Sequence, residues 1–496
     1  MSTGDTLDRL TSGVPGLDVV LKGGFFKGGL YLIQGTPGTG KTTLAHQLCF
    51  NHIANIGPRA LYVTLLSEFH ARMLQYLGGL SFFDESKLPD QFSYISAFRV
   101  MRDEGLSGLA VLIRREIIAK KVSLLIVDGL VAAQRAADND QAFNEFMHEL
   151  QGIAIATNCT VVLVASTGRD AKHTPEHTMV DGILQLSDHS FGWSTERALQ
   201  VVKVRGSDYL RGRHAYRLTQ HGVVVHPRIE ALLEEPAIPD KANTERFTSG
   251  ERHLDAMLGG GLVAGTSTLI LGPSGVGKTT LGLQFLCGCS DAEPGLLFGF
   301  YETPARILAK SHQVCKPLVG LLESGAVEML WQPPTKGSLD ACGDRLLAAV
   351  RRRGVRRLFI DGLGALHKAA ESIEREASFL SALMHQLRAE EVTTVSTLEV
   401  NTIIGPNIKA PIGDLSSLAE NLVLLRYVEL RARLHRLISI LKVRDSDFDP
   451  LMHEFVVIDQ GVVIDESPQN AETIMRALVH DDAASLPPKR QPPAVG

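Results

Sequence analysis

The sequence predicts an α/β protein made of two tandem copies of one domain, each with a mainly parallel β-sheet flanked by helices. The first observation is a repeat, because LTSGVPGLDVVLKGG from Leu10 matches FTSGERHLDAMLGGG from Phe247 at an offset of 237 residues. The second is that each copy has an apolar strand, a glycine-rich loop and a helical pattern in succession. The third is a later apolar run in each copy, typical of a strand buried on both faces.

Length and composition agree with a folded protein of more than one domain. The chain has 496 residues, 44% hydrophobic and 21% charged, and a domain usually takes roughly 100–200 residues. No apolar run reaches the roughly 18 residues that span a bilayer, and the N-terminus MSTGDTLDRL is polar. We therefore expect neither a membrane segment nor a signal peptide, and a cytoplasmic location.

The cysteine spacing and the net charge argue against several classes of protein. The six cysteines are scattered without a C-x-x-C pair, which argues against zinc ribbons and disulfide frameworks and predicts reduced packing residues. The formal net charge of −5 gives no global positive field for sequence-independent nucleic-acid binding. A local basic groove stays open at this point.

The repeat sets the domain boundaries. We expect a first copy over residues 1–240, a second copy over residues 241–467 and a C-terminal segment over residues 468–496. The first copy ends in RIEALLEEPAIPDKANTER, which has two prolines, four Glu and the character of an exposed linker. In the C-terminal segment NAETIMRALV predicts one helix, and DDAASLPPKRQPPAVG is a polar, proline-rich tail.

The glycine-rich loops predict phosphate binding, as in a P-loop. Glycine lets backbone N–H groups point at a polyphosphate, and the N-terminus of the following helix adds a partial positive charge. We expect Lys41 and Lys278 to reach the β and γ phosphates of ATP, and the Thr42 and Thr279 hydroxyls to bind Mg²⁺. The predicted loops comprise Gly35, Thr36, Pro37, Gly38, Thr39, Gly40, Lys41, Thr42 and Thr43, and Gly272, Pro273, Ser274, Gly275, Val276, Gly277, Lys278, Thr279 and Thr280.

An aspartate ends a buried apolar run in each copy. KKVSLLIVDG places Asp128 there and VRRLFIDG places Asp361. A lone aspartate after a strand is often a turn residue. Here the distances along the chain from the P-loop lysine are similar, 87 and 83 residues, which favours a role in holding the metal and its water shell.

Hydrolysis needs a group that orients or deprotonates water, commonly a glutamate after the strand that follows the P-loop helix. The second copy offers Glu302 in GLLFGFYETPARIL, and in the first copy Glu68 is the nearest carboxylate in RALYVTLLSEFHARML. Glu68 is equally well explained as an acid in the first turn of a helix, where the helix dipole favours it.

A strand rich in β-branched residues closes each copy and ends in a Lys-Val-Arg sequence. LQVVKVRGSDYLRG contains Lys203 and Arg205, and ISILKVRDSDFDP contains Lys442 and Arg444. Strand alternation puts both basic side chains of a pair on one face. Their recurrence favours phosphate sensing at a neighbouring subunit, and the alternative is lysine on an edge strand that prevents aggregation.

The order of these motifs, from T-S-G-x-x-x-L-D through G-K-T-T to K-x-R, resembles that of the KaiC family of circadian-clock ATPases. The resemblance covers about residues 8–467, and LVLLRYVELRARLHRLISILKVRDS is similar to the end of that family's second domain. It implies two tandem RecA-like P-loop domains that hydrolyse ATP with Mg²⁺. It also implies a double-ring homohexamer with ATP between subunits, clock-type or other signalling, and a KaiB-like or histidine-kinase partner.

The sequence departs from the family at its glutamate pair, which falls without gaps on Leu66-Ser67 and on Tyr301-Glu302. We therefore expect the first copy to bind ATP mainly to hold the ring, and hydrolysis to depend on the second. The family's phosphorylated Ser-Thr pair falls on Ser416 and Ser417, which implies a serine/threonine autokinase. A capping or turn role is the alternative for these serines.

Two other classes of function stay open beside the ATPase. A RecA- or RadA-like DNA-dependent ATPase needs a basic path for the strand and usually an accessory module, and the one long basic run is RRRGVRR at residues 351–357, which we expect at a helix end. A nucleotide-binding scaffold with little turnover is the third class. Membrane or nucleic-acid partners are not expected.

Overall fold

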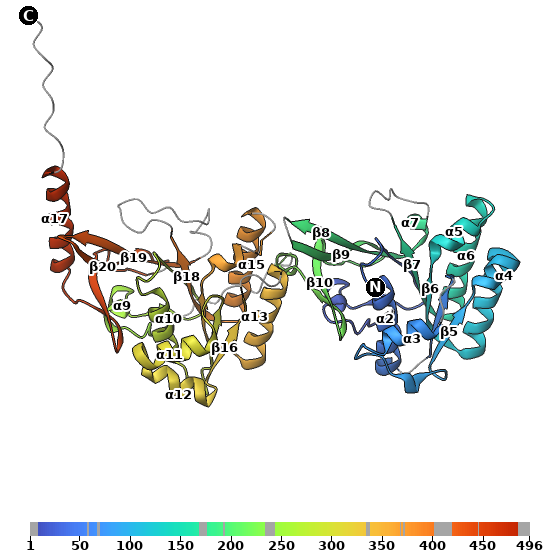
Figure 1. Cartoon of the computed structure of the whole chain (residues 1–496), viewed down its shortest axis with the longest axis horizontal. Coiled ribbons are helices and arrows are strands. Elements are labelled where there is room, and N and C mark those ends of the chain that lie inside the picture. The colour runs from blue at the N-terminus through green and yellow to red at the C-terminus, as the bar shows by residue number, and fades with distance from the viewer. Residues whose placement is uncertain are drawn as a thin grey trace, which may run out of the picture. The chain divides into compact units, whose positions relative to one another are not determined.

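The computed structural model describes residues 8–56, 59–66, 70–167, 176–191, 194–233, 244–333, 338–367, 369–370, 373–400, 419–444 and 446–484. The chain forms two compact units, residues 1–232 and 233–496, one for each copy (Figure 1). Among the described residues no helix has both the length and the apolar character that crossing a bilayer requires.

The first copy is built on a sheet of nine strands among its described residues, in the order β11-β10-β9-β8-β3-β7-β6-β4-β5. The strands from β8 to β5 run parallel, and those from β8 to β11 pair antiparallel. The strands are β3 (Leu30–Gly35), β4 (Arg59–Thr64), β5 (Phe92–Ser96), β6 (Val122–Asp128), β7 (Thr160–Ser166), β8 (Gly182–Phe191), β9 (Ser194–Val204), β10 (Arg213–Thr219) and β11 (Gly222–His226), beside a short pair β1 (Arg9–Leu10) and β2 (Phe25–Phe26).

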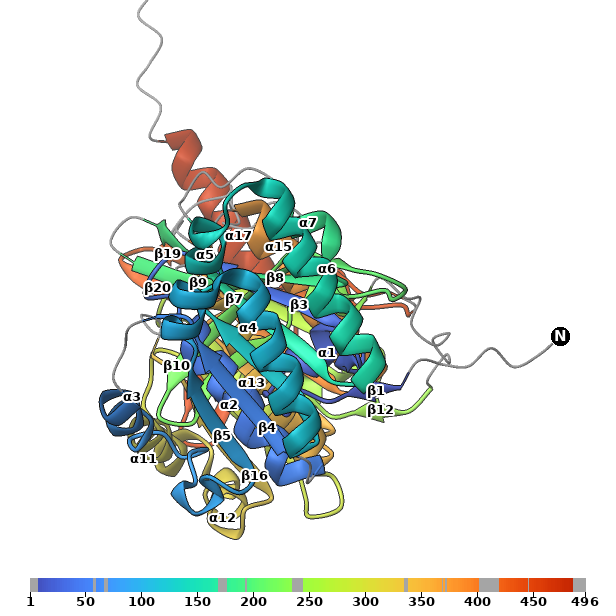
Figure 2. The ribbon, with the colours of Figure 1, turned by 90° about the vertical axis from the view of Figure 1, so that its right-hand side faces the viewer.

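Helices cover both faces of this sheet. Successive strand side chains point to opposite faces, and both sets are apolar, so each face needs a cover. Tyr31 and Ile33 of β3 pack with α2, and Leu30 and Leu32 pack with α4 and α6 on the other face. Figure 2 shows α4 and α6 side by side in front of the strands. The helices are α1 (Leu17–Val20), α2 (Lys41–Ile56), α3 (His70–Leu77), the 3₁₀ turn η1 (Glu85–Lys87), α4 (Phe98–Lys120), α5 (Leu130–Ala136), α6 (Asp140–Thr157), α7 (Glu176–Met179) and α8 (Ile229–Leu232).

The second copy repeats this architecture with the strand order β16-β15-β17-β18-β14-β19-β20-β21-β22 among its described residues. Its strands are β12 (Arg246–Phe247), β13 (Leu262–Val263), β14 (Ser267–Gly272), β15 (Gly295–Gly299), β16 (Val327–Trp331), β17 (Arg357–Asp361), β18 (Thr393–Glu399), β19 (Asn421–Leu430), β20 (Arg433–Lys442), β21 (His453–Ile458) and β22 (Gly461–Ile464). Its helices are α9 (Arg252–Met257), α10 (Lys278–Leu286), α11 (Pro304–Val314), α12 (Lys316–Ser324), α13 (Leu339–Arg353), α14 (Gly364–His367), α15 (Ile373–Ala389) and α17 (Gln469–Ala484).

These two mostly parallel sheets confirm the predicted tandem α/β fold. The expectation that the Lys-Val-Arg strand closes each copy is wrong, because a hairpin follows it in both, β10–β11 in the first copy and β21–β22 in the second. The helix expected over NAETIMRALV is present as α17, and its residues Ala471 and Ile474 pack on Val428 and Leu437 of the second sheet.

The repeated T-S-G-x-x-x-L-D motif has a structural role. In the first copy the Asp18 carboxylate accepts hydrogen bonds from the backbone N–H groups of Ser12 and Gly13, at 2.8 and 3.2 Å. In the second copy Asp255 accepts from the Ser249 N–H at 2.7 Å. The aspartate therefore caps a tight turn, and this explains why its spacing from T-S-G is kept.

A buried glutamine ties the P-loop helix of each copy to the last strand. In α2, Gln47 accepts from the Val223 N–H at 2.7 Å and donates to the Val223 carbonyl at 3.1 Å. In α10, Gln284 makes the same pair of bonds with Val462, at 2.9 and 3.2 Å. The glutamine thus satisfies backbone groups of β11 and β22 that would otherwise be buried without partners.

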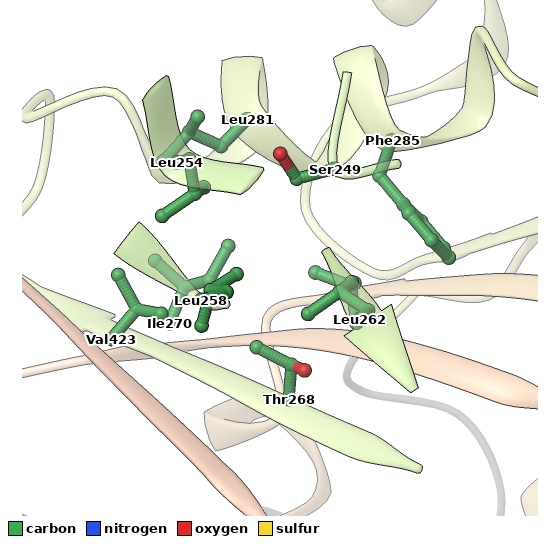
Figure 3. A pocket seen from close by; sticks show the side chains of 10 residues that line it. Ser249, Leu254, Leu258, Leu262, Thr268, Ile270, Leu281, Phe285 and Val423 are labelled. Carbon is green, nitrogen blue, oxygen red and sulfur yellow. The ribbon is translucent and has the colours of Figure 1, made fainter. Parts of the chain in front are cut away.

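A small apolar cavity of about 20 Å³ lies in the core of the second copy, and Figure 3 shows Leu258, Leu262 and Ile270 around it. At the 237-residue offset, the first copy has Phe25 in place of Leu262 and Tyr31 in place of Thr268. Those two rings meet edge to face with centroids 4.7 Å apart. The cavity is therefore a packing defect left by smaller side chains, too small and too apolar to be a ligand site.

We predict that Leu262→Phe stabilises the second copy by about 0.5–2 kcal/mol, because the larger ring fills this cavity. The measurement is urea unfolding of a Trp193→Phe chain, in which Trp331 is the remaining tryptophan and lies in the second copy. Leu297→Phe is the matched control, since Leu297 is buried in β15 but does not line the cavity, and overpacking there should destabilise. Equal effects of the two variants would contradict the cavity explanation.

Two buried histidines of α2 predict acid sensitivity of the first copy. Burial lowers the pKa of His46 and of His52 to about 4, below the unfolded value of about 6.5. The two neutral histidines contribute to the free energy of unfolding above about pH 6.5. This contribution is lost as the pH falls toward 4, because the unfolded chain then binds protons that the folded chain does not. We expect the free energy of unfolding to be lower at pH 5 than at pH 7 by about 2 kcal/mol for each histidine.

Urea unfolding of a Trp331→Phe chain at the two pH values measures this loss through Trp193. The second copy has Leu283 and Cys289 at these two positions, so His46→Leu is the matched variant and should remove about half of the acid loss. An unchanged pH dependence in His46→Leu would show that other groups cause it.

Candidate functional site

Both P-loops lie at the carboxyl ends of parallel strands, where ligands bind in open α/β sheets. In the first copy the loop follows β3, which lies between β7 and β8, and in the second it follows β14, between β18 and β19. The loop glycines Gly40 and Gly277 have φ angles of +87° and +125°, which residues with a Cβ rarely adopt. A Cβ on Gly40 would also lie 2.8 Å from the Leu218 side chain of β10.

The P-loop lysines are held by carbonyl oxygens of their own loops. Lys41 Nζ donates to the oxygens of Gly35 and Thr36, each at 2.9 Å. Lys278 Nζ donates to those of Gly272 and Pro273, at 2.8 and 2.6 Å. Desolvation lowers the pKa of both lysines, and the nearby carboxylates oppose this shift. Each ammonium group is thus positioned beside the loop backbone that the sequence predicts to surround phosphate.

A threonine at the start of each P-loop helix meets the aspartate at the end of a parallel strand. Thr42 Oγ1 donates to Asp128 Oδ2 at 3.2 Å in the first copy. In the second, Thr279 Oγ1 lies 3.2 and 3.1 Å from the two carboxylate oxygens of Asp361. Both sites offer a hydroxyl and a carboxylate, the hard oxygen ligands that suit Mg²⁺.

The second partner of the aspartate differs between the copies. In the first, Tyr62 of β4 donates its hydroxyl to Asp128 Oδ2 at 2.6 Å, and desolvation followed by the Asp128 charge raises the pKa of Tyr62 well above 10. The His46 ring stacks on Tyr62 with centroids 4.1 Å apart. In the second copy the strand register places Leu297 at the position of Tyr62.

In the second copy the donor comes from the opposite side. Thr397 of β18 donates its hydroxyl to Asp361 Oδ1 at 2.8 Å. Burial raises the pKa of the Asp361 carboxyl, and the hydrogen bonds from Thr397 and Thr279 act against this shift. The strand-end aspartate therefore accepts a hydrogen bond from a tyrosine in the first copy and from a second threonine in the second copy.

Glu302 lies just past β15 and forms an ion pair with Lys310 of α11. Its charge also acts on Asp361, for which it raises the pKa. The neighbouring Tyr301 is 53% exposed, and its ring lies where a Cβ on Gly362 would be, within 2.7 Å. Glu302 therefore stands at the same edge of the sheet as the Thr279–Asp361 pair.

Sequence reasoning missed a second carboxylate in this site, Glu399. It ends β18 and pairs in register with Gly272, the residue whose carbonyl holds Lys278. Burial and then the charge of Glu399 raise the pKa of Tyr301, and Glu399 also acts on Lys278. The available signal was an acidic residue directly after TTVSTL, a run rich in β-branched residues that favours a strand but is less apolar than the run that identified Asp361.

Three predicted residues, Glu68, Ser416 and Ser417, lie outside the described residues, and their roles stay predictions. For Glu68 the surrounding elements give two alignments. Strand register equates Thr64 with Gly299, which aligns Glu302 with Ser67. The buried helix positions Met73 and Ile307 instead align Glu302 with Glu68, so the first copy carries one extra residue between strand and helix.

The Lys-Val-Arg residues contact backbone of their own copy. Lys203 Nζ donates to the carbonyls of Val180 and His177 at 2.8 and 3.0 Å, and Arg205 donates to that of Thr178. In the second copy Lys442 Nζ donates to the Ala419 carbonyl at 3.0 Å. Edge protection is a wrong explanation for these residues, because β9 and β20 lie inside their sheets.

The arginines of RRRGVRR are engaged within the second copy. The first three lie in the last turn of α13, as expected of a helix end. Arg357 is buried, and its guanidinium lies 4.4 Å from the Phe247 ring centroid. The others form ion pairs: Arg351 with Glu390, Arg352 and Arg353 with Glu328, and Arg356 with Glu245 and Glu391.

Comparison with known proteins agrees with this geometry. The family described as "ATPase: KaiC" matches residues 10–230 and again residues 248–469. The chain is 24% identical to the circadian clock oscillator protein KaiC of Prochlorococcus marinus (strain MIT 9313), with 96% of each chain covered. It is 24% identical to the protein of that name from Synechococcus elongatus and 25% identical to that from Thermosynechococcus vestitus, in each case over 94% of this chain and 91% of the relative. Since the two family matches together fill most of the sequence, the chain belongs to the KaiC ATPase family.

Proposed function

We propose that this chain is a Mg²⁺-dependent ATPase that assembles as a ring, in which the second copy performs most of the hydrolysis and the first mainly holds ATP. The observation that carries this proposal is the repeated site geometry. In both copies a lysine is held beside the P-loop backbone, and a threonine hydroxyl meets a strand-end aspartate within 3.2 Å.

The roles of the residues follow from their donors and charges. The lysine ammonium exchanges its carbonyl partners for phosphate oxygens, and the helix N-terminus adds backbone N–H donors. Thr42 with Asp128, and Thr279 with Asp361, would hold Mg²⁺ directly and through its water shell. When bound, Mg²⁺ supplies neutralisation of the charge on the β and γ phosphates.

Glu302 is the best-supported group for orienting the attacking water. Lys310 donates to Oε1 of the Glu302 carboxylate, and a carboxylate has further lone pairs that can accept a hydrogen bond from water. The two side chains are 30% and 32% exposed, and ion pairs this exposed to solvent contribute at most about 1 kcal/mol. The Lys310 contact therefore holds Glu302 in the site without preventing its use.

Two features support weaker hydrolysis in the first copy. The Tyr62 hydroxyl occupies a lone pair of Asp128 that a metal-bound water would otherwise use. The extra residue before α3 also separates Glu68 from the strand end by one more position than Glu302. A misplacement of about 1 Å at a reacting group is enough to cost about 10²-fold in rate.

We predict that Glu302→Gln lowers steady-state phosphate release by about 10²-fold, the usual contribution of a general base, while Glu68→Gln changes it less than about threefold. The control is Glu323→Gln, an exposed glutamate at the end of α12, which should leave the rate unchanged. A large loss in Glu68→Gln with little loss in Glu302→Gln would reverse the assignment of the two copies.

We infer a homohexameric double ring, as the relatives' family implies. Lys203 and Lys442 anchor the ends of their strands within each copy. Arg205 is half exposed and Arg444 is exposed just beyond them, where a neighbour's phosphate would meet them. The relatives are named clock oscillator proteins, and we propose for this chain a signalling or clock-type role read out by a partner protein.

We predict that native mass spectrometry detects six chains per particle with MgATP and fewer without it. Lys41→Ala should abolish the hexamer at the same ATP concentration, because the first copy then loses its phosphate contact. Lys278→Ala should keep the hexamer and lose turnover. A monomer at saturating MgATP would contradict the ring, and loss of the hexamer only in Lys278→Ala would assign assembly to the second copy.

The engaged arginines of residues 351–357 argue against a DNA-dependent ATPase. A path for single-stranded DNA needs cations that neutralise phosphates, whereas the arginines of this run pair with glutamates of their own copy, apart from Arg357, which is buried. The ATPase proposal therefore needs no nucleic acid.

A further inference from the structure

Two cysteines meet at the end of the second P-loop helix. Cys287 directly follows α10, and Cys315 lies between α11 and α12. Both sulfurs lie near the Leu283 carbonyl oxygen, at 3.5 and 3.8 Å, and the Cys287 thiol can instead donate its proton to Cys315. Two residues that are 28 positions apart in the sequence thus bring their thiols to one carbonyl oxygen in the same core cluster.

The two thiols differ in acidity because of where they lie on their helices. Cys315 is the N-cap of α12, where the helix dipole favours negative charge, and the hydrogen bond from Cys287 lowers the pKa of the Cys315 thiol. Cys287 is the C-cap of α10, and that hydrogen bond together with burial raises the pKa of its thiol. Cys287 is half-buried and Cys315 is buried, so Cys287 is the thiol that a solute reaches first.

The first copy shows that packing alone does not require these cysteines. At the 237-residue offset the counterpart of Cys287 is Phe50. Its ring packs on Phe82 and Phe83 with centroids 6.1 and 5.2 Å away. The same place in the fold is therefore filled by an aromatic cluster in one copy and by a thiol pair in the other.

We propose that Cys287 and Cys315 form a reversible disulfide, which makes the end of the second P-loop helix an oxidation site. The Cys315 thiol gives up its proton, and its sulfur attacks a hydroperoxide that enters past Cys287; the O–O bond breaks, the proton goes to the alcohol or water that leaves, and Cys315 becomes a sulfenic acid. The Cys287 thiol then attacks the Cys315 sulfur, the S–S bond forms as the S–O bond breaks, and the hydroxide that leaves takes the Cys287 proton to give water. Two thiols and one hydroperoxide thus give one disulfide, one water and one alcohol or second water, and a dithiol reductant reverses the change.

The cross-link would join the P-loop helix to the helices behind Glu302. Helix α10 begins at Lys278 and ends next to Cys287, and α11, which precedes Cys315, carries the Lys310 that holds Glu302. Oxidation would therefore restrict movement between the loop that binds phosphate and the element that positions Glu302. This consequence rests on the proposed function, whereas the cross-link itself does not.

The experiment uses the full chain, reduced and then treated with a small excess of hydrogen peroxide. Remaining thiols are alkylated, and the digest is examined by mass spectrometry. We expect one cross-linked peptide pair that contains Cys287 and Cys315, disappears with dithiothreitol, and is absent from Cys287→Ser. Cys289→Ser is the matched control, because Cys289 lies two residues away and its sulfur contacts Gly295, so this variant should keep the cross-link.

A second measurement needs no variant. In glutathione buffers of increasing oxidation, Cys287 and Cys315 of the unaltered chain should lose alkylation together, and phosphate release should fall at least about threefold and recover on reduction. Separate titration of the two thiols, or a cross-link from Cys289 to Cys315 instead, would overturn the proposal. Joint titration with no ATP hydrolysis even in the reduced chain would sustain the disulfide and contradict only the proposed function.

Discussion

The hydrogen bond between a threonine in the first turn of the P-loop helix and the aspartate at the end of a parallel strand organises each copy. It joins Thr42 to Asp128 and Thr279 to Asp361, residues more than 80 positions apart. Through it the helix N-terminus is fixed over the carboxyl edge of the sheet. The P-loop, the lysine beside it and the carboxylates at the neighbouring strand ends take their positions from this arrangement.

The two copies keep this bond and vary what surrounds it. In the first copy Tyr62, which stacks on the buried His46 ring, donates a hydrogen bond to Asp128. In the second copy Thr397 of β18 donates a hydrogen bond to Asp361. The second copy also adds two carboxylates: Glu399, whose charge acts on the P-loop lysine Lys278, and Glu302, which forms an ion pair with Lys310. A duplicated domain has thereby acquired two sites that share their phosphate contacts and differ in their acid–base groups.

The features that could be predicted from the sequence are those that depend on residues adjacent in the chain. The repeat, the glycine loops and the apolar runs that end in Asp128 and Asp361 each follow from a few adjacent residues. The roles of Tyr62, Thr397 and Glu399 depend on which strands are neighbours and in what register, and the terminal hairpins made the edge explanation for Lys203 and Lys442 wrong. Lys310 reaches Glu302 only because a helix follows directly, which residue types alone do not specify.

The glutamine contact between each P-loop helix and the last strand has a consequence for synthesis on the ribosome. The hydrogen-bond partner of Gln47 is Val223, which is translated 176 residues later. The partner of Gln284 is Val462, which is translated 178 residues later. At about 5–20 residues per second, roughly 10–35 seconds pass before the partner strand is translated. During that interval the helix that follows the phosphate loop can pack on the parallel strands already made, but its side facing β11 or β22 stays uncovered, and this side is open to chaperones.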